Sequence, residues 1–133
     1  MNDAATTVGE LRAVVRRFVE ERAWRVFHTP KNLASSVAIE AAELMEHFQW
    51  LTPEQSRAVA DDAGRREAVG EELADVVCYV LALAETLNID VADAVARKMV
   101  KNAAKYPADE FRGRFGRDDR GGIEPGTRPS GDN

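Results

Sequence analysis

Apolar residues recur every three or four positions along four stretches of the chain, which is the spacing of one face of an α-helix. Thr7 and Glu10 form a T-x-x-E capping-box pattern at the start of the first stretch. The apolar positions of this first predicted helix are Val8, Leu11, Val14, Val15, Phe18 and Val19. We expect a break at Thr29-Pro30, because the residue before a proline avoids the helical conformation.

The second stretch predicts a helix that begins near Asn32, a good N-cap residue, and runs to about Trp50. Pro53 follows shortly afterwards, and Thr52 is placed to cap a short acidic helix. We expect Gly64 to break that short helix, because glycine disfavours helical conformation.

The third long helix is predicted over residues 66–87, and the fourth from an N-cap at Asp90 to about Tyr106. Pro107 ends the fourth helix, because proline lacks the N–H that a helix interior requires. Four amphipathic helices without a strand pattern predict an all-α fold with a four-helix bundle-like arrangement.

Residues 76–84 of the third helix are apolar nearly all round. A helix of this kind is normally buried on every side. A four-helix monomer of 133 residues would leave one side of it bare. The pattern therefore predicts an oligomer whose interface uses this helix.

The composition changes after Pro107, where glycine and proline become frequent. Such a segment cannot bury enough apolar surface to fold, so we expect a disordered tail over residues 113–133. Residues 1–112 then form one domain, and the chain's 44% hydrophobic and 31% charged residues fit a soluble globular protein.

A formal net charge of −5 gives the chain no overall attraction for nucleic acid or for an anionic membrane. The N-terminus lacks the charged and apolar regions of a secretory signal, and no apolar run is long enough to span a bilayer. The single cysteine, Cys78, cannot form an internal disulfide. We therefore expect a cytoplasmic protein that binds neither nucleic acid nor membrane.

Two acidic pairs interrupt the helical pattern: Glu40 with Glu43, and Glu72 with Asp75. The i, i+3 spacing places both carboxylates of a pair on one face of a helix, at the edge of the apolar stripe. Like charges repel there, and an unpaired carboxylate is costly to bury, so two such pairs indicate a bound cation. Oxygen ligands suit Mg²⁺ or Mn²⁺. The alternative interpretation is a set of solvated surface acids.

The fourth helix carries cationic and amide side chains at helical spacing, which are Lys98, Lys101, Asn102 and Lys105. They can contact phosphates opposite a metal site, or they can form a solvated face. Trp24 and Trp50 lie near helix ends, where a nucleobase can stack on an indole. Core packing is the alternative interpretation for both.

The chain resembles the MazG-like all-α nucleoside triphosphate pyrophosphohydrolases, and within them it is most similar to the dCTP pyrophosphatase branch. The resemblance covers residues 11–113. It rests on three stretches, ERAWRVFHTPKNLASSVAIEAAELMEHFQW, EELADVVCYVLALAETLNID and KNAAKYPADEFRG. Within them the paired ExxE and ExxD helices, the W-x-x-F-H-x-P-x-N-L stretch and the Lys-Tyr-Pro stretch are the specific features.

This resemblance implies Mg²⁺-dependent hydrolysis of a nucleoside triphosphate, dCTP or a related pyrimidine nucleotide, to the monophosphate and pyrophosphate. It also implies a tetramer built as a dimer of dimers. Four carboxylates match the family's metal ligands, which are Glu40, Glu43, Glu72 and Asp75. Other positions match the substrate pocket, with Lys98, Asn102 and Tyr106 near the phosphates and sugar, Trp24 and Trp50 around the base, and His28 close by.

Glu43 is the preferred candidate for the carboxylate that orients or deprotonates the attacking water. A broad-specificity house-cleaning dNTP pyrophosphatase is the alternative enzyme, and a catalytically inactive oligomerisation or regulatory module is the alternative outside catalysis. A redox di-iron bundle is disfavoured, because such sites use an E-x-x-H motif. None of Glu40, Glu43 and Glu72 has a histidine three residues later.

Overall fold

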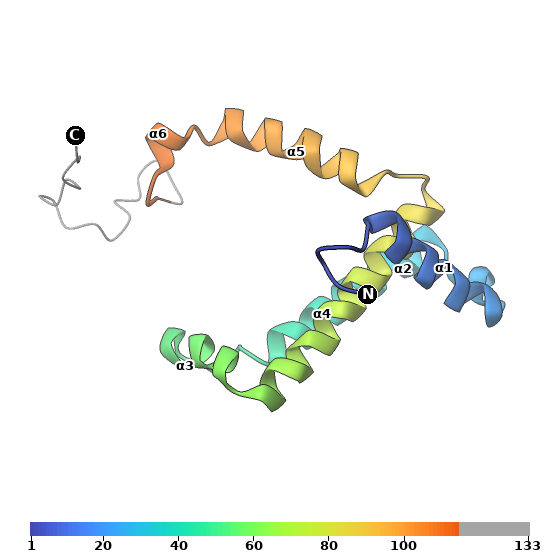
Figure 1. Ribbon diagram of the computed structural model, residues 1–133, viewed down its shortest axis with the longest axis horizontal. Helices are drawn as coiled ribbons and strands as arrows, with labels where there is room; N and C mark the ends of the chain where they lie inside the picture. Colours follow the sequence, from blue (N-terminus) through green and yellow to red (C-terminus); the bar gives the residue numbers. More distant parts are fainter. Residues whose placement is uncertain (115–133) are drawn as a thin grey trace, which may run out of the picture. The chain divides into compact units, whose positions relative to one another are not determined.

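A computed structural model describes residues 1–114 of the chain, and this part contains helices and turns but no strand (Figure 1). The helices are α1 (Val8–Glu21), η1 (Trp24–Phe27), α2 (Pro30–Glu46), α3 (Pro53–Ala58), η2 (Val59–Asp61), α4 (Ala63–Thr86), α5 (Val91–Lys105) and α6 (Ala108–Phe111), where η marks a 3₁₀-helix. The predicted all-α fold class is confirmed. The chain divides into two compact units, Met1–Ala92 and a second that begins at Asp93.

Two predicted helix starts are confirmed in atomic detail. At α1 the Thr7 hydroxyl accepts from the Glu10 backbone N–H at 3.2 Å, and the Glu10 carboxylate accepts from the Thr7 N–H at 2.7 Å. Thr52 and Gln55 form the same reciprocal cap at α3. Each box satisfies two backbone donors that a helix N-terminus otherwise leaves without partners.

The predicted start of the second helix is wrong by a few residues. Thr29, not Asn32, is the N-cap of α2, and its hydroxyl accepts from the Asn32 backbone N–H at 3.3 Å. Pro30 takes the first helical position, where its missing N–H costs nothing. Thr29-Pro30 therefore starts a helix as well as ending the preceding segment. The helix stops at Glu46, four residues before the expected end at Trp50.

The expected break at Gly64 is also wrong. Asp62 caps α4 by accepting from the Arg65 backbone N–H at 3.0 Å, and Gly64 lies in the first turn of that helix. A side-chain cap stabilises a helix start by about 1 kcal/mol, which offsets the similar cost of one glycine. The helix ends before Asn88, whose φ of 52° turns the chain.

In the first unit α2 and α4 lie side by side, and α1 packs against the C-terminal half of α4 (Figure 1). The buried core is small and consists of Val19, Leu33, Val59, Leu81, Ala82 and Ala84. Large apolar side chains remain exposed around it, including Ile39 at 55% and Leu73 at 53%. Residues 76–84, expected to be buried on every side, still expose Val77 and Val80.

In the second unit α5 ends at Lys105, within one residue of the predicted end, and Pro107 precedes the short α6, which the pattern did not predict. The rings of Tyr106 and Phe111 meet edge to face, with centroids 5.2 Å apart. Nearly all of the expected tail, residues 115–133, lies outside the described residues. Among residues 1–114 no helix is both long enough and apolar enough to cross a membrane.

Candidate functional site

The two acidic pairs meet where α2 and α4 run side by side. Carboxylate oxygens of Glu40 and Glu43 on α2 and of Glu72 on α4 all lie within 4.8 Å of one another. Around an ion bound at 2.0–2.1 Å, opposite oxygen ligands are about 4 Å apart. A cluster of this size, made only of carboxylate oxygens, fits a hard divalent cation with small side-chain adjustments.

Asp75 takes part in the same electrostatic field, although its oxygens lie outside that closest group. Partial burial raises the pKa of Glu40, and the negative charges of Glu43, Asp75 and Glu72 raise it further. Three of the four carboxylates predicted from the sequence therefore act on the fourth, Glu40. A bound cation would offset this repulsion and the loss of hydration.

A cavity of about 310 Å³ lies between α1, η1 and α4. Its lining includes Phe18, Trp24, His28, Asp75, Cys78 and Tyr79. Since Asp75 both lines this cavity and acts on Glu40, the cavity adjoins the acidic cluster. Burial, and then the charge of Asp75, raise the pKa of the Cys78 thiol, so that the cavity presents a neutral sulfur group.

The structure therefore brings together Trp24, His28 and Asp75, which the sequence predicted for the site. Phe18 and Val14, which the sequence assigned to the apolar stripe of the first helix, also line this cavity. Their side chains are 48% and 41% exposed. Helical spacing shows only that such residues share a face, and no sequence signal separates a core face from a cavity wall.

Phe18 and Trp24 form an aromatic wall of this cavity. Ala23 takes the left-handed conformation, with a φ of 52°, and this turn brings Trp24 back toward α1. The two rings meet edge to face at a centroid distance of 5.8 Å. The guanidinium carbon of Arg22 lies 3.6 Å from the Phe18 ring centroid, and its Nη1 donates to the Phe18 carbonyl at 3.0 Å. Arg22 thus braces the wall from outside the cavity.

Trp50, predicted to hold a base, is not part of this cavity. Its side chain is 86% exposed, and it lies in the turn between α2 and α3. In this single chain it has no role in the pocket around Trp24.

The predicted phosphate-contact residues belong to the second unit, on α5 and just after it, and are Lys98, Asn102, Lys105 and Tyr106. A side-chain hydrogen bond and the charge of Lys105 lower the pKa of Tyr106, and Lys98 lowers it further. Both lysines therefore lie within electrostatic reach of the Tyr106 hydroxyl. The two lysines together form a cationic surface that suits an anion.

Comparisons with known proteins agree with these features. The MazG-like family model matches residues 35–114, which include both acidic pairs and α5. A pyrophosphatase crystal structure from Archaeoglobus fulgidus is similar to this chain, with a TM-score of 0.71 and 41% sequence identity. The similarity covers 80% of this chain and 98% of the archaeal one.

Two proteins named dCTP pyrophosphatase 1 are also similar. The Bos taurus protein is 37% identical over 107 residues, which make up 80% of this chain and 63% of the bovine protein. The Homo sapiens protein is 38% identical over 102 residues, or 77% of this chain and 60% of the human protein. The chain thus spans about three fifths of the length of these relatives. With its paired acidic helices and its matched residues 35–114, the chain belongs to the MazG-like family.

Proposed function

We propose that this chain is a nucleoside triphosphate pyrophosphohydrolase that acts on dCTP or a related pyrimidine nucleotide. The observation that carries the proposal is the junction at Asp75, where an aromatic cavity meets a cluster of carboxylates. The cavity offers a place for a base, and the cluster offers ligands for a cation that binds phosphates. The similar proteins are named as a dCTP pyrophosphatase and a pyrophosphatase, which supports the same assignment.

Glu40, Glu43, Glu72 and Asp75 would hold the metal, with Mg²⁺ favoured and Mn²⁺ also suited to oxygen ligands. When bound, the ion neutralises phosphate charge and makes a bound water more acidic. The close group of ligand atoms contains only carboxylates and no histidine or cysteine, which favours a hard cation over Zn²⁺.

The chain's own groups account for the other parts of the reaction. Trp24 offers an indole face on which a base stacks, and His28 supplies a polar group within the same cavity. Glu43 orients the attacking water and accepts its proton as the oxygen bonds to the α-phosphorus. The bond from the α-phosphorus to the bridging oxygen then breaks, and pyrophosphate leaves. Lys98, Asn102 and Tyr106 would lie near the phosphates and the sugar, and Lys105 would be a further phosphate contact.

We also infer a homo-oligomer, with a tetramer as the expected form. The first unit has a small core and exposes large apolar side chains on α2 and α4, among them Ile39, Leu73 and Val77. Exposed apolar surface of this extent is typical of a subunit interface. Trp50, which is exposed and outside its own chain's cavity, would complete the base pocket of a second copy.

The substrate is tested by measuring pyrophosphate release from the common NTPs and dNTPs, with Mg²⁺ or with EDTA. We expect the highest kcat/KM with dCTP or another pyrimidine deoxynucleotide, and no release in EDTA. Similar rates with several dNTPs would instead support a broad house-cleaning enzyme. No release with any nucleotide, together with no Mg²⁺-dependent binding of a non-hydrolysable analogue by calorimetry, would support the inactive module.

Replacing Arg22 by Met should raise the KM for the preferred nucleotide about fivefold and leave kcat within about twofold. The variant loses the cation–π contact to Phe18 and a backbone hydrogen bond, which together contribute about 1 kcal/mol at an exposed site. Arg17→Met on the same helix is the matched control, because Arg17 is exposed and does not line the cavity. Steady-state kinetics report the change, and an unaltered KM would contradict the bracing role.

A further inference from the structure

A second cavity, of about 380 Å³, adjoins the aromatic one in the first unit. Val15, Val19, His28 and Ala82 line both cavities. The second cavity differs in chemistry, because three arginines line it: Arg12 and Arg16 from α1 and Arg25 from η1. Nothing in the proposed reaction uses these three side chains.

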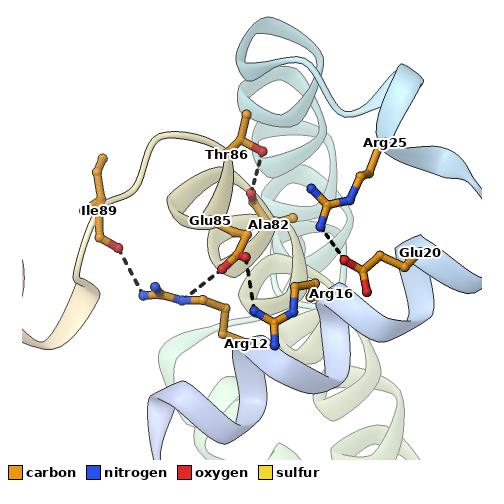
Figure 2. A network of polar contacts seen from close by, with 8 residues as sticks. All are labelled: Arg12, Arg16, Glu20, Arg25, Ala82, Glu85, Thr86 and Ile89. Carbon is orange, nitrogen blue, oxygen red and sulfur yellow. Dashed lines mark hydrogen bonds and ion pairs between the residues drawn. The ribbon is translucent and has the colours of Figure 1, made fainter.

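The carboxylates near these arginines do not balance their charge. Glu85 of α4 lies between two of them, with Oε1 3.5 Å from Nη1 of Arg16 and Oε2 3.9 Å from Nε of Arg12 (Figure 2). Arg25 pairs with Glu20, which does not line the cavity. One carboxylate therefore faces two guanidinium groups, which leaves a net positive charge in a partly enclosed space.

Arg12 shows that this arrangement is incompletely satisfied. Its Nη2 donates to the Ile89 carbonyl at 3.0 Å (Figure 2). Its side chain is only 24% exposed. Its Nε is buried and has no hydrogen-bond partner within residues 1–114. A buried donor without a partner is costly, and the 3.9 Å separation from Glu85 is too long for a hydrogen bond.

The arginine-lined cavity is separate from the proposed metal site. The acidic residues Glu72 and Asp75 lie in the middle of α4, whereas Leu81, Glu85 and Thr86 near its C-terminus line this cavity. Ten residues of helix separate Asp75 from Glu85, an axial distance of about 15 Å. A phosphate held at the acidic cluster is therefore not the group that this cavity would bind.

We propose that the arginine-lined cavity binds the phosphate group of a small molecule, at a site distinct from the substrate's triphosphate. Guanidinium groups match phosphate through two parallel N–H donors, and Arg16 and Arg25 reach the cavity from different elements. The cavity volume lies within the range of small-molecule sites. Binding there does not depend on the proposed function.

The test is isothermal titration calorimetry of the full chain in EDTA, with inorganic phosphate, pyrophosphate and a nucleoside monophosphate as separate probes. The wild type should bind at least one probe, and Arg16→Gln/Arg25→Gln should weaken that binding at least about tenfold, because charge-assisted hydrogen bonds are lost. The matched control is Arg57→Gln, an exposed arginine paired with Glu54 on α3, which should bind within about twofold of wild type. Tighter binding of the monophosphate than of either inorganic probe would identify a nucleotide as the source of the phosphate.

Three results would overturn the proposal. The wild type could bind no probe at millimolar concentration, the double variant could bind as tightly as the wild type, or Arg57→Gln could lose as much affinity as the double variant. A changed oligomeric mass of the double variant, without anion binding by the wild type, would assign these arginines to a subunit contact instead. Arg16 and Arg25 have exposed side chains, so the single variants provide folded proteins if the double variant does not fold. The measurement uses neither metal nor turnover, so its failure and that of the proposed function are distinguishable.

Discussion

The variants Glu43→Gln and Asp75→Asn should each lose at least about a hundredfold in kcat while the chain remains folded. Both substitutions keep the size of the side chain and remove one negative charge from the cluster around Glu40. The proposed metal site then loses a charged ligand, and Glu43→Gln also removes the proposed base. General-base catalysis alone contributes about 10² to 10⁴ in rate.

The same substitutions should not destabilise the metal-free protein. Partial burial and the charges of Glu43, Asp75 and Glu72 raise the pKa of Glu40 in the folded chain. A carboxyl whose pKa is higher in the folded state than in the unfolded state lowers the stability of the folded chain as the pH rises and the group ionises. Removing a neighbouring charge reduces this cost, so we expect the melting temperature in EDTA to stay the same or to rise.

Pyrophosphate release with Mg²⁺ measures kcat, and circular dichroism in EDTA measures the melting temperature. The matched controls are Glu46→Gln on α2 and Glu71→Gln on α4, which are exposed and lie outside the close carboxylate group. Both should retain near-wild-type turnover. Near-wild-type turnover by Glu43→Gln or Asp75→Asn would remove that residue from the mechanism, and a lower melting temperature would assign the loss to folding.

The sequence predicted the helices well because helix formation depends on local features. Apolar spacing fixes which residues share a face, and a pair such as Thr7 and Glu10 fixes where a helix begins. The errors at Thr29-Pro30 and Gly64 have a local cause as well. Proline and glycine can interrupt a helix, but a capping side chain just before them makes the same position a helix start.

The site was predictable only as far as chemistry shows in the sequence. The acidic pairs could be predicted because an unpaired carboxylate is costly to bury, so carboxylates at the edge of an apolar stripe indicate a binding partner. The role of Phe18 could not be predicted, because an aromatic residue that lines a cavity has the same helical spacing as one in a core. Arg22 acts on the cavity through Phe18, and such indirect contacts leave no pattern in the sequence.

A mixture of two defective chains should regain activity if Trp50 serves the pocket of a second copy. Trp50→Ala should lower kcat/KM about ten- to a hundredfold, because stacking of a base on an aromatic ring contributes about 1–3 kcal/mol. Glu43→Gln should be nearly inactive for the reason given above. In a mixed oligomer, a chain with intact carboxylates can receive Trp50 from a Glu43→Gln neighbour, so random assembly from equal amounts restores about a quarter of the sites.

The experiment compares kcat/KM before and after the two variants are unfolded together and refolded, with light scattering to follow the assembly. The matched control mixes Trp50→Ala with the double variant Glu43→Gln/Trp50→Ala, which cannot supply the missing indole. Activity equal to the average of the separate variants would mean that Trp50 acts within its own chain or not at all. A monomeric mass at micromolar concentration would be a stronger contradiction, because the exposed Trp50 and the exposed apolar faces of α2 and α4 would then have no second copy to contact.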